Sequence, residues 1–353
     1  MRDRYAMITV DTEALPKRAS EDHVNRLIWG RFPKGTAGVA EMCRIGDEFG
    51  AKHVFFTDLC GAYSYLDELK EVVRWLDEQG QDVQLHTHPE YLPDSFWQEH
   101  GLANRPQYMN LYTDQERAEF VFRHFADVMT SVTGKPVLAH RAGSFRWNAD
   151  TLRALKAVGI PLSFNNSVCA VHNGQCVYSE PTNEPFSWSN GIIEVPMTEQ
   201  RILGKLGKPD WWVRLTYPES RYFRFRPWWG RLLLNALSGS PPFAVFLLHS
   251  WSLLHWDQDG LGEYRDDQRL EGYRKLLSQL TKDYDVITTA DFLDLQARGK
   301  IVPSHTVDLS LAQYTPPTPK KKPGAQKAAP KKVVTKATAG NKPAQKKATE
   351  KKA

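Results

Sequence analysis

The sequence has few cysteines, no long apolar run and no arginine in residues 314–353, and each absence excludes a class of protein. Its 353 residues include 4 cysteines, Cys43, Cys60, Cys169 and Cys176. They are too few for a disulfide framework, lack the spacing of a zinc knuckle, and are expected to be buried thiols. No segment approaches the roughly 20 apolar residues of a membrane-spanning helix, and residues 5–10 are too short for a signal-peptide core. We therefore expect a cytoplasmic protein, with a peripheral position at the inner membrane surface left open.

The net charge of +5 averages two unlike parts. Residues 314–353 hold 12 lysines and one acid, Glu350, a net charge of +11, whereas residues 1–313 hold 34 basic and 40 acidic residues, a net charge of −6. The Lys/Pro/Ala-rich tail cannot bury enough apolar surface to offset its conformational entropy, so we expect it to be disordered. Lysines without interleaved aromatic residues favour nonspecific attraction to an anionic membrane surface or other polyanions. No sequence-specific nucleic-acid binding is expected.

Residues 1–313 alternate short β-branched runs with longer amphipathic segments. Strands are predicted at 5–10, 53–58, 82–88, 136–141, 161–166, 192–197, 243–249 and 285–289. Helical periodicity is present at 64–79, 113–132, 148–158 and 266–282. Such alternation indicates βα units and a parallel sheet. The sequence therefore predicts an α/β protein: a distorted (β/α) barrel of seven or eight mostly parallel strands over 1–313, followed by a disordered tail over 314–353.

One segment of the barrel domain breaks this alternation. Residues from about 200 to 240 are dense in Trp, Tyr, Phe and Arg, and include Trp211, Trp212, Trp228 and Trp229. The segment is too apolar for a solvent-exposed loop that has no packing or binding role. Packing as a local lid or core, stacking on sugars and contact with a membrane interface all remain open as interpretations.

Polar and charged residues gather at the carboxyl ends of the predicted strands. They are Asp11, Glu13, Asp58, His86, His88, Arg141, Asn165, Asn166 and His249. In parallel barrels this end carries the chemistry. Because residues i and i+2 of a strand share a face, Asp11 and Glu13 are expected on one side, as are His86 and His88. Two imidazoles and a carboxylate can bind a divalent metal and leave positions open for water.

Four short motifs follow one another in a distinctive order: TVDTE at 9–13, LHTHPEYL at 85–92, HRAGSF at 140–145 and FLLHS at 246–250. Their order and spacing resemble those of the polysaccharide deacetylases of the NodB-homology type (carbohydrate esterase family 4). The pattern is most similar to the variant branch associated with cell-surface polysaccharide clusters, and it spans about residues 5–298. The resemblance implies a distorted (β/α) barrel and metal-dependent removal of an acyl group, usually acetyl, from an amino sugar or surface-glycan precursor. The implied partner is a carbohydrate, N-acetylated or lipid-linked.

Residue by residue, the resemblance makes Asp11 the catalytic base, Arg141 its partner and His249 the acid that protonates the leaving amine. The family usually has a second Asp directly after the first, where this chain has Thr12, and Glu13 is then the expected metal carboxylate. Gln84 stands at the family's first metal histidine, so His86 is expected to join His88. The implied cofactor is a divalent metal ion, zinc ahead of other first-row metals. The candidates for substrate contact are Asp58, Asn165 and Trp251, with Asp58 equally interpretable as a turn residue.

Two alternatives belong to other classes. Thr12 and Gln84 also fit a catalytically inactive deacetylase-like protein that binds a glycan without turnover. The His-x-His motif by itself resembles amidohydrolases and the polymerase-and-histidinol-phosphatase phosphoesterases. In those families the motif opens the domain on its first strand, whereas here it lies on the third predicted strand.

Overall fold

The computed structural model describes residues 4–15, 18–19, 22–33, 35–103, 107–202, 211–218, 241–256, 258 and 262–316. The chain divides into two compact units, Met1–Thr315 and Pro316–Ala353. The predicted disordered tail lies outside the described residues from residue 317 onward. Among the residues that are described, no helix has the length and apolar character needed to cross a membrane.

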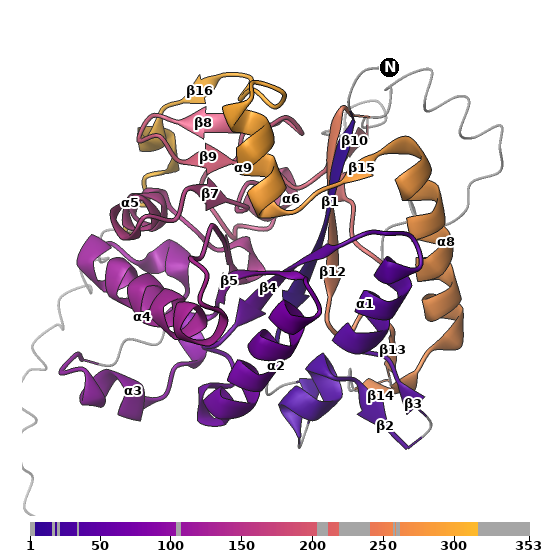
Figure 1. Ribbon diagram of the computed structural model, residues 1–353. Coiled ribbons are helices and arrows are strands. Elements are labelled where there is room, and N and C mark those ends of the chain that lie inside the picture. The colour runs from indigo at the N-terminus through magenta and orange to yellow at the C-terminus, as the bar shows by residue number, and fades with distance from the viewer. Residues whose placement is uncertain are drawn as a thin grey trace, which may run out of the picture. The chain divides into compact units, whose positions relative to one another are not determined.

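A mostly parallel, curled sheet forms the centre of the first unit (Figure 1). Its strands follow the order β12-β1-β4-β5-β6-β7-β9-β8-β16, and β15 pairs with β1. Every neighbouring pair from β12 to β9 is parallel, and β8 is antiparallel to β9. The strands are β1 (Tyr5–Thr12), β4 (His53–Asp58), β5 (Asp82–Thr87), β6 (Ala139–Ala142), β7 (Leu162–Ser163), β8 (Phe186–Trp188), β9 (Ile193–Glu194), β12 (Phe243–His249), β15 (Asp285–Val286) and β16 (Thr306–Val307).

This architecture confirms the predicted fold class, with a difference in strand number. All eight predicted strands are present, and β8 and β16 bring the sheet to 10 strands. These two additions are 3 and 2 residues long and lie at one edge of the sheet. Such short segments carry too little alternation to be recognised from sequence.

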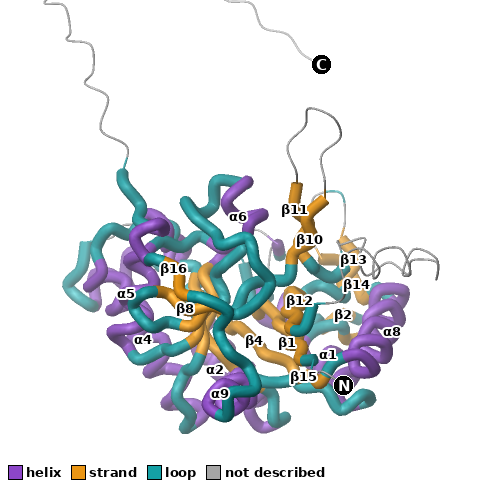
Figure 2. Tube along the Cα trace, turned by 90° about the horizontal axis from the view of Figure 1, so that it is seen from above, coloured by secondary structure: helices purple, strands orange, loops and turns teal. Residues whose placement is uncertain are grey.

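Helices surround the sheet. In Figure 2 the strands lie in the middle, with α4 and α5 on one side and α1 and α8 on the other. Neighbouring helices pack in pairs, α1 with α8, α2 with α4 and α4 with α5. The helices are α1 (Val39–Asp47), α2 (Leu66–Glu78), α3 (Asp94–Glu99), α4 (Gln115–Thr133), α5 (Ala149–Val158), α6 (Val168–His172), α8 (Asp267–Asp283) and α9 (Thr289–Ala297). The four helices predicted from periodicity correspond to α2, α4, α5 and α8.

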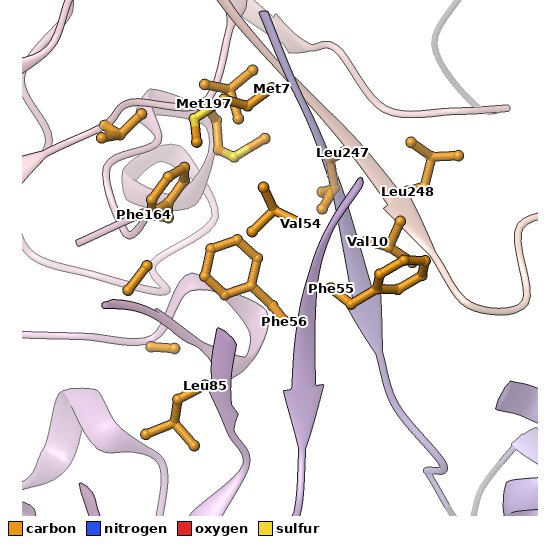
Figure 3. Packing of buried hydrophobic residues seen from close by; sticks show 14 of the residues in the cluster. Met7, Val10, Val54, Phe55, Phe56, Leu85, Phe164, Met197, Leu247 and Leu248 are labelled. Atoms are coloured by element: carbon orange, nitrogen blue, oxygen red, sulfur yellow. The ribbon is translucent and has the colours of Figure 1, made fainter. Parts of the chain in front are cut away.

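The central strands are buried on both faces, as parallel strands covered by helices must be. All 8 residues of β1 and all 6 of β4 are buried. Figure 3 shows Phe55 and Phe56 leaving β4 on opposite sides. Phe56 meets Phe164, with ring centroids 5.0 Å apart, in the interior that the curled sheet encloses.

The segment after β9 returns to β12, the strand at the other end of the sheet order. The Thr198 amide donates to the Val245 carbonyl of β12 at 3.4 Å, and the Val245 amide donates to the Thr198 hydroxyl at 2.8 Å. Further along, the amides of Leu247 and Tyr217 bond to the carbonyls of Leu215 and Leu247 at 3.0 and 2.9 Å. The barrel is therefore distorted: an irregular segment stands where a further parallel strand would close it.

Four predicted strands are markedly shorter than expected. The strands predicted at 192–197 and 285–289 are each 2 residues long in the structure, as β9 and β15. In the other two, β6 and β7, side chains take over backbone hydrogen bonds. Residues 136–141 were predicted, but β6 begins at Ala139, since the amides of Leu138 and Ala139 donate to Gln84 Oε1 at 2.8 and 2.9 Å. Residues 161–166 were predicted, but β7 ends at Ser163. Beyond it, the amides of Asn165 and Asn166 donate to Glu194 Oε1 at 2.6 and 2.7 Å.

The aromatic segment at 200–240 is only partly described. It begins as an antiparallel pair, β10 (Glu199–Ile202) and β11 (Trp211–Arg214). Trp228 and Trp229 lie outside the described residues. Two further antiparallel pairs are peripheral: β2 (Arg31–Phe32) with β3 (Gly35–Thr36), and β13 (Leu254–Trp256) with β14 (Gly262–Arg265).

Candidate metal and catalytic site

The strand register brings the predicted site residues together at the carboxyl end of the barrel. Asp11 of β1 lies beside His249 of β12, and His86 of β5 lies between Asp58 of β4 and Arg141 of β6. Parallel strands that end at the same level present their last residues to one another. The clustering expected from the strand ends is therefore present in the structure.

Glu13 contacts both histidines of the second motif, LHTHPEYL. Its Oε1 lies 2.8 Å from His86 Nε2 and 3.2 Å from His88 Nε2. All three side chains are buried, and one ligand atom from each lies within 4.8 Å of the others. Burial raises the pKa of Glu13, but the two imidazoles outweigh it and hold that pKa well below its ordinary range. An anionic oxygen and two imidazole nitrogens thus converge on one point.

Asp11 is paired with an arginine inside the barrel. Arg141 Nη1 donates to Asp11 Oδ1 at 2.6 Å, and Nη2 donates to the Thr9 hydroxyl at 2.9 Å. The guanidinium, which is fully buried, lies 4.3 Å from the centroid of the Phe56 ring. Burial lowers the pKa of Arg141, and Asp11 partly restores it. The ion pair holds the Asp11 carboxylate in one orientation.

His249 completes a second, overlapping set. Ligand atoms of Asp11, Glu13 and His249 lie within 4.8 Å of one another. The imidazole is half-buried and stacks on Trp251, with centroids 4.9 Å apart and planes 18° apart. On the rim, Arg18 lies 5.0 Å from the Trp251 ring and 5.4 Å from the ring of Trp256. Trp251 is itself buried, so the ring supports His249 from within the protein, which differs from the predicted substrate contact.

Asp58 and Asn165 lie behind the site rather than at its surface, which differs from the predicted substrate contact. Both side chains are fully buried. The Asp58 carboxylate accepts from the amides of Cys60, Gly61 and His88 at 2.9, 2.9 and 3.2 Å. Asn165 Oδ1 accepts from the Ala142 amide at 2.6 Å. These hydrogen bonds hold the backbone at His88 and at the end of β6, next to Arg141, so Asp58 acts as the turn residue.

The two departures from the family pattern have a structural explanation. The Thr12 hydroxyl donates to the Val10 carbonyl at 3.3 Å, and Glu13 supplies the carboxylate that meets the histidines. The Gln84 side chain is used at the opposite end of β5, where it bonds to Asp82 and Thr289 at 2.6 and 3.1 Å. Gln84 therefore cannot serve as the first metal histidine, and His86 supplies an imidazole at the site instead.

One residue of the site was not among the predicted residues. Glu90, on the 3-10 turn Pro89–Tyr91, places Oε1 2.7 Å from His88 Nδ1. On the other side of the ring, a Cβ at Gly143 would lie 2.4 Å from His88 Nδ1 and Cε1. The motif His88-Pro89-Glu90 contained the signal, because a turn returns residue i+2 toward residue i.

The donor set of Glu13, His86 and His88 suits a divalent ion. Two neutral imidazoles and one carboxylate are the ligands of many catalytic zinc sites, which keep one position open. Carboxylates outnumber guanidinium groups around this point: Asp11, Asp58, Glu13 and Glu90 interact with the histidines or with Arg141, and Arg214 interacts with Arg141. Such surroundings favour a bound cation.

Comparisons with known proteins support the fold. No family model matches the chain, and no curated protein matches it in sequence. The structure is similar to a Mycobacterium smegmatis protein assigned as a polysaccharide deacetylase, with a TM-score of 0.52 and 13% identity over 90% of this chain and 96% of that one. It is also similar to a 4-alpha-glucanotransferase from Thermococcus litoralis, with a TM-score of 0.55 and 14% identity over 89% of this chain and 43% of that one. At these identities the likeness establishes the fold alone, a distorted (β/α) barrel.

Proposed function

We propose that the chain is a metal-dependent hydrolase that removes an N-acyl group, with acetyl as the first to test, from an amino sugar of a glycan. The observation that carries this proposal is the convergence of Glu13 with His86 and His88 beside the Asp11–Arg141 pair and His249. A fold shared with a glycan deacetylase supports a carbohydrate substrate. Zinc is the first ion to test, given the donor set.

In this proposal the chain's residues divide the work of amide hydrolysis. Glu13, His86 and His88 would hold the divalent ion, which when bound supplies Lewis acidity toward the acyl carbonyl and acidifies water. Arg141 holds one oxygen of Asp11, and the other oxygen is then oriented to accept a proton from the attacking water. His249, stacked on Trp251, donates a proton to the departing amine.

The glucanotransferase that shares the fold suggests glycosyl transfer as a rival reaction. Glycosyl transfer generally uses two carboxyl groups, one of them protonated to assist the leaving group. Here Glu13 contacts two imidazoles and its pKa is held low, and Asp11 is paired with Arg141. This pairing with basic groups favours acyl hydrolysis over glycosyl transfer.

The test is acetate release from N-acetylated chito-oligosaccharides by zinc-loaded protein. We expect Asp11→Asn and His249→Ala each to lower kcat/KM by about 10²- to 10⁴-fold, the range of general acid–base catalysis. Asp67→Asn, an exposed change on α2, serves as a matched charge control and leaves the rate unchanged. Undiminished turnover in both site variants would contradict the assigned roles. Glycan binding without acetate release would favour the inactive binding protein.

A further inference from the structure

Both histidines of the site turn Nε2 toward Glu13, but their other ring nitrogens have different surroundings. His88 Nδ1 lies 2.7 Å from Glu90 Oε1. His86 Nδ1 is buried and has no hydrogen-bond partner among the described residues. Among the described residues, a carboxylate therefore contacts Nδ1 of His88 but not Nδ1 of His86.

The local backbone explains how Glu90 reaches His88. Pro89 opens a 3-10 turn, and the Tyr91 amide donates to the His88 carbonyl at 3.0 Å. The turn returns the Glu90 side chain onto the ring that precedes it. The Glu90 side chain is only 11% exposed, so the contact is shielded from water.

The rest of the surroundings restrict the His88 ring further. The His88 amide donates to Asp58 Oδ1 at 3.2 Å, which holds its backbone. The absence of a side chain at Gly143 leaves room for the ring, since a Cβ there would lie 2.4 Å from two of its atoms. The end of β4 and the segments after β5 and β6 thus meet at this one imidazole.

The chemistry of the pair determines the tautomer. An ionised carboxylate accepts hydrogen bonds and donates none, so His88 Nδ1 carries the hydrogen of its bond to Glu90 Oε1. Nε2 lies 3.2 Å from Glu13 Oε1 and by the same argument carries a hydrogen while no ion is bound. A metal ion held beside Glu13 would replace that hydrogen, whereas the bond from Nδ1 to Glu90 would remain. Carboxylate–histidine–metal arrangements fix ring orientation and raise ligand basicity, and their loss typically weakens metal binding by about 10- to 100-fold.

We propose that Glu90 is a positioning residue that makes His88 the stronger of the two imidazole ligands. This inference rests on the metal site of the proposed function, but not on the reaction assigned to it. Glu90 contacts the ring nitrogen of His88 that does not face Glu13, so it acts through the His88 ring.

The experiment measures zinc affinity of metal-stripped, full-length protein by competition with a chromophoric chelator. Glu90→Ala removes the acceptor, whereas Glu90→Gln keeps the shape and an acceptor oxygen but loses the charge. Glu99→Gln, an exposed change on α3, is the matched control. We expect Glu90→Ala to weaken zinc binding by about 10- to 100-fold, Glu90→Gln by less, and Glu99→Gln not at all. The visible absorption of bound Co²⁺ should shift in the two Glu90 variants and stay constant in the control.

The outcomes separate this inference from its alternatives. A lower melting temperature with unchanged zinc affinity in folded Glu90→Ala would show a structural role and overturn the proposal. If Glu90→Ala does not fold, an affinity of Glu90→Gln equal to wild type overturns it instead. Wild-type protein that binds zinc in a Glu90-dependent way but releases no acetate would leave this inference standing and refute the proposed reaction. Wild-type protein that binds no zinc refutes both.

Discussion

His53 opens strand β4 at the amino end of the barrel, and His88 follows strand β5 at the carboxyl end. Both are buried, but burial lowers the pKa of His53 to about 4, whereas Glu13, Glu90 and Asp58 overcome burial and hold the pKa of His88 well above its ordinary value. His53 meets the Tyr273 hydroxyl and is neutral. The pKa values of these two buried histidines thus shift in opposite directions, because carboxylates surround only His88.

The same contrast extends to the neighbouring groups at each end. At the amino end Gln84 and Asp82 bond to one another and to backbone amides of β6 and α9. A cavity of about 370 Å³ is lined there by these two residues, Lys135 and Thr288 among others. At the carboxyl end the buried groups are charged and converge on one point. Polar groups at the amino end hold strands and helices together, and those at the carboxyl end form the proposed metal site.

Among the changes that compare the two ends of the barrel, we expect the largest loss of stability from removing Arg141, the buried cation of the carboxyl end. Arg141→Met leaves Asp11 buried without its partner, which should lower the free energy of unfolding by about 3–5 kcal/mol. Urea denaturation measures the loss. The double variant Arg141→Met/Asp11→Asn should recover part of the stability but no activity. An Arg141→Met protein as stable as wild type would show that the pair is not needed to hold Asp11.

A smaller effect is expected at the amino end. Gln84→Ala leaves the amides of Leu138 and Ala139 without their acceptor, which should cost about 1–3 kcal/mol in unfolding free energy. Zinc affinity should not change, because Gln84 lies away from the metal ligands. Gln84→His, which restores the histidine of the family pattern, should not increase zinc affinity either. A tighter-binding Gln84→His protein would show that this position reaches the metal.

The smallest predicted effect is a pH dependence from His53. Its pKa is about 4 in the folded protein and near 6.5 when unfolded, so the unfolded state binds the extra proton between these values. Stability is therefore complete above pH 6.5 and falls as pH decreases toward 4, by about 1 kcal/mol between pH 8 and pH 6. Urea midpoints across this range, compared with those of His53→Gln, measure the contribution. Equal pH slopes in the two proteins would contradict it.

Much of the barrel and of its carboxyl end could be predicted because both depend on local patterns. Buried parallel strands are continuous apolar runs, and Asp11, His86, Arg141 and His249 each stand at or next to the end of one. The strand lengths could not be predicted in the same way. β7 ends early because the Glu194 side chain accepts the hydrogen bonds of the Asn165 and Asn166 amides, which would otherwise pair within the sheet. Glu194 lies 29 and 28 residues further along the chain, so no local pattern indicates this contact.

The roles of single side chains were harder to predict for the same reason. Nothing in the sequence near Asp58 shows that three backbone amides surround it, and nothing near Gln84 shows that its partners lie on β6 and α9. These assignments depend on which backbone groups face each side chain after the chain has folded. Glu90 differs in that it was missed although its signal is local: it stands two residues after His88, across the turn Pro89–Tyr91.

In the proposed function, the carboxyl end of the barrel holds one divalent ion through Glu13, His86 and His88. An anomalous difference map, recorded at the zinc absorption edge from crystals of the full chain grown with zinc, tests this directly. We expect one peak within zinc-ligand distance of these three side chains, about 2.0–2.2 Å from the nitrogen and oxygen atoms. A well-ordered site with no peak between them, or zinc bound only elsewhere on the protein, would contradict it.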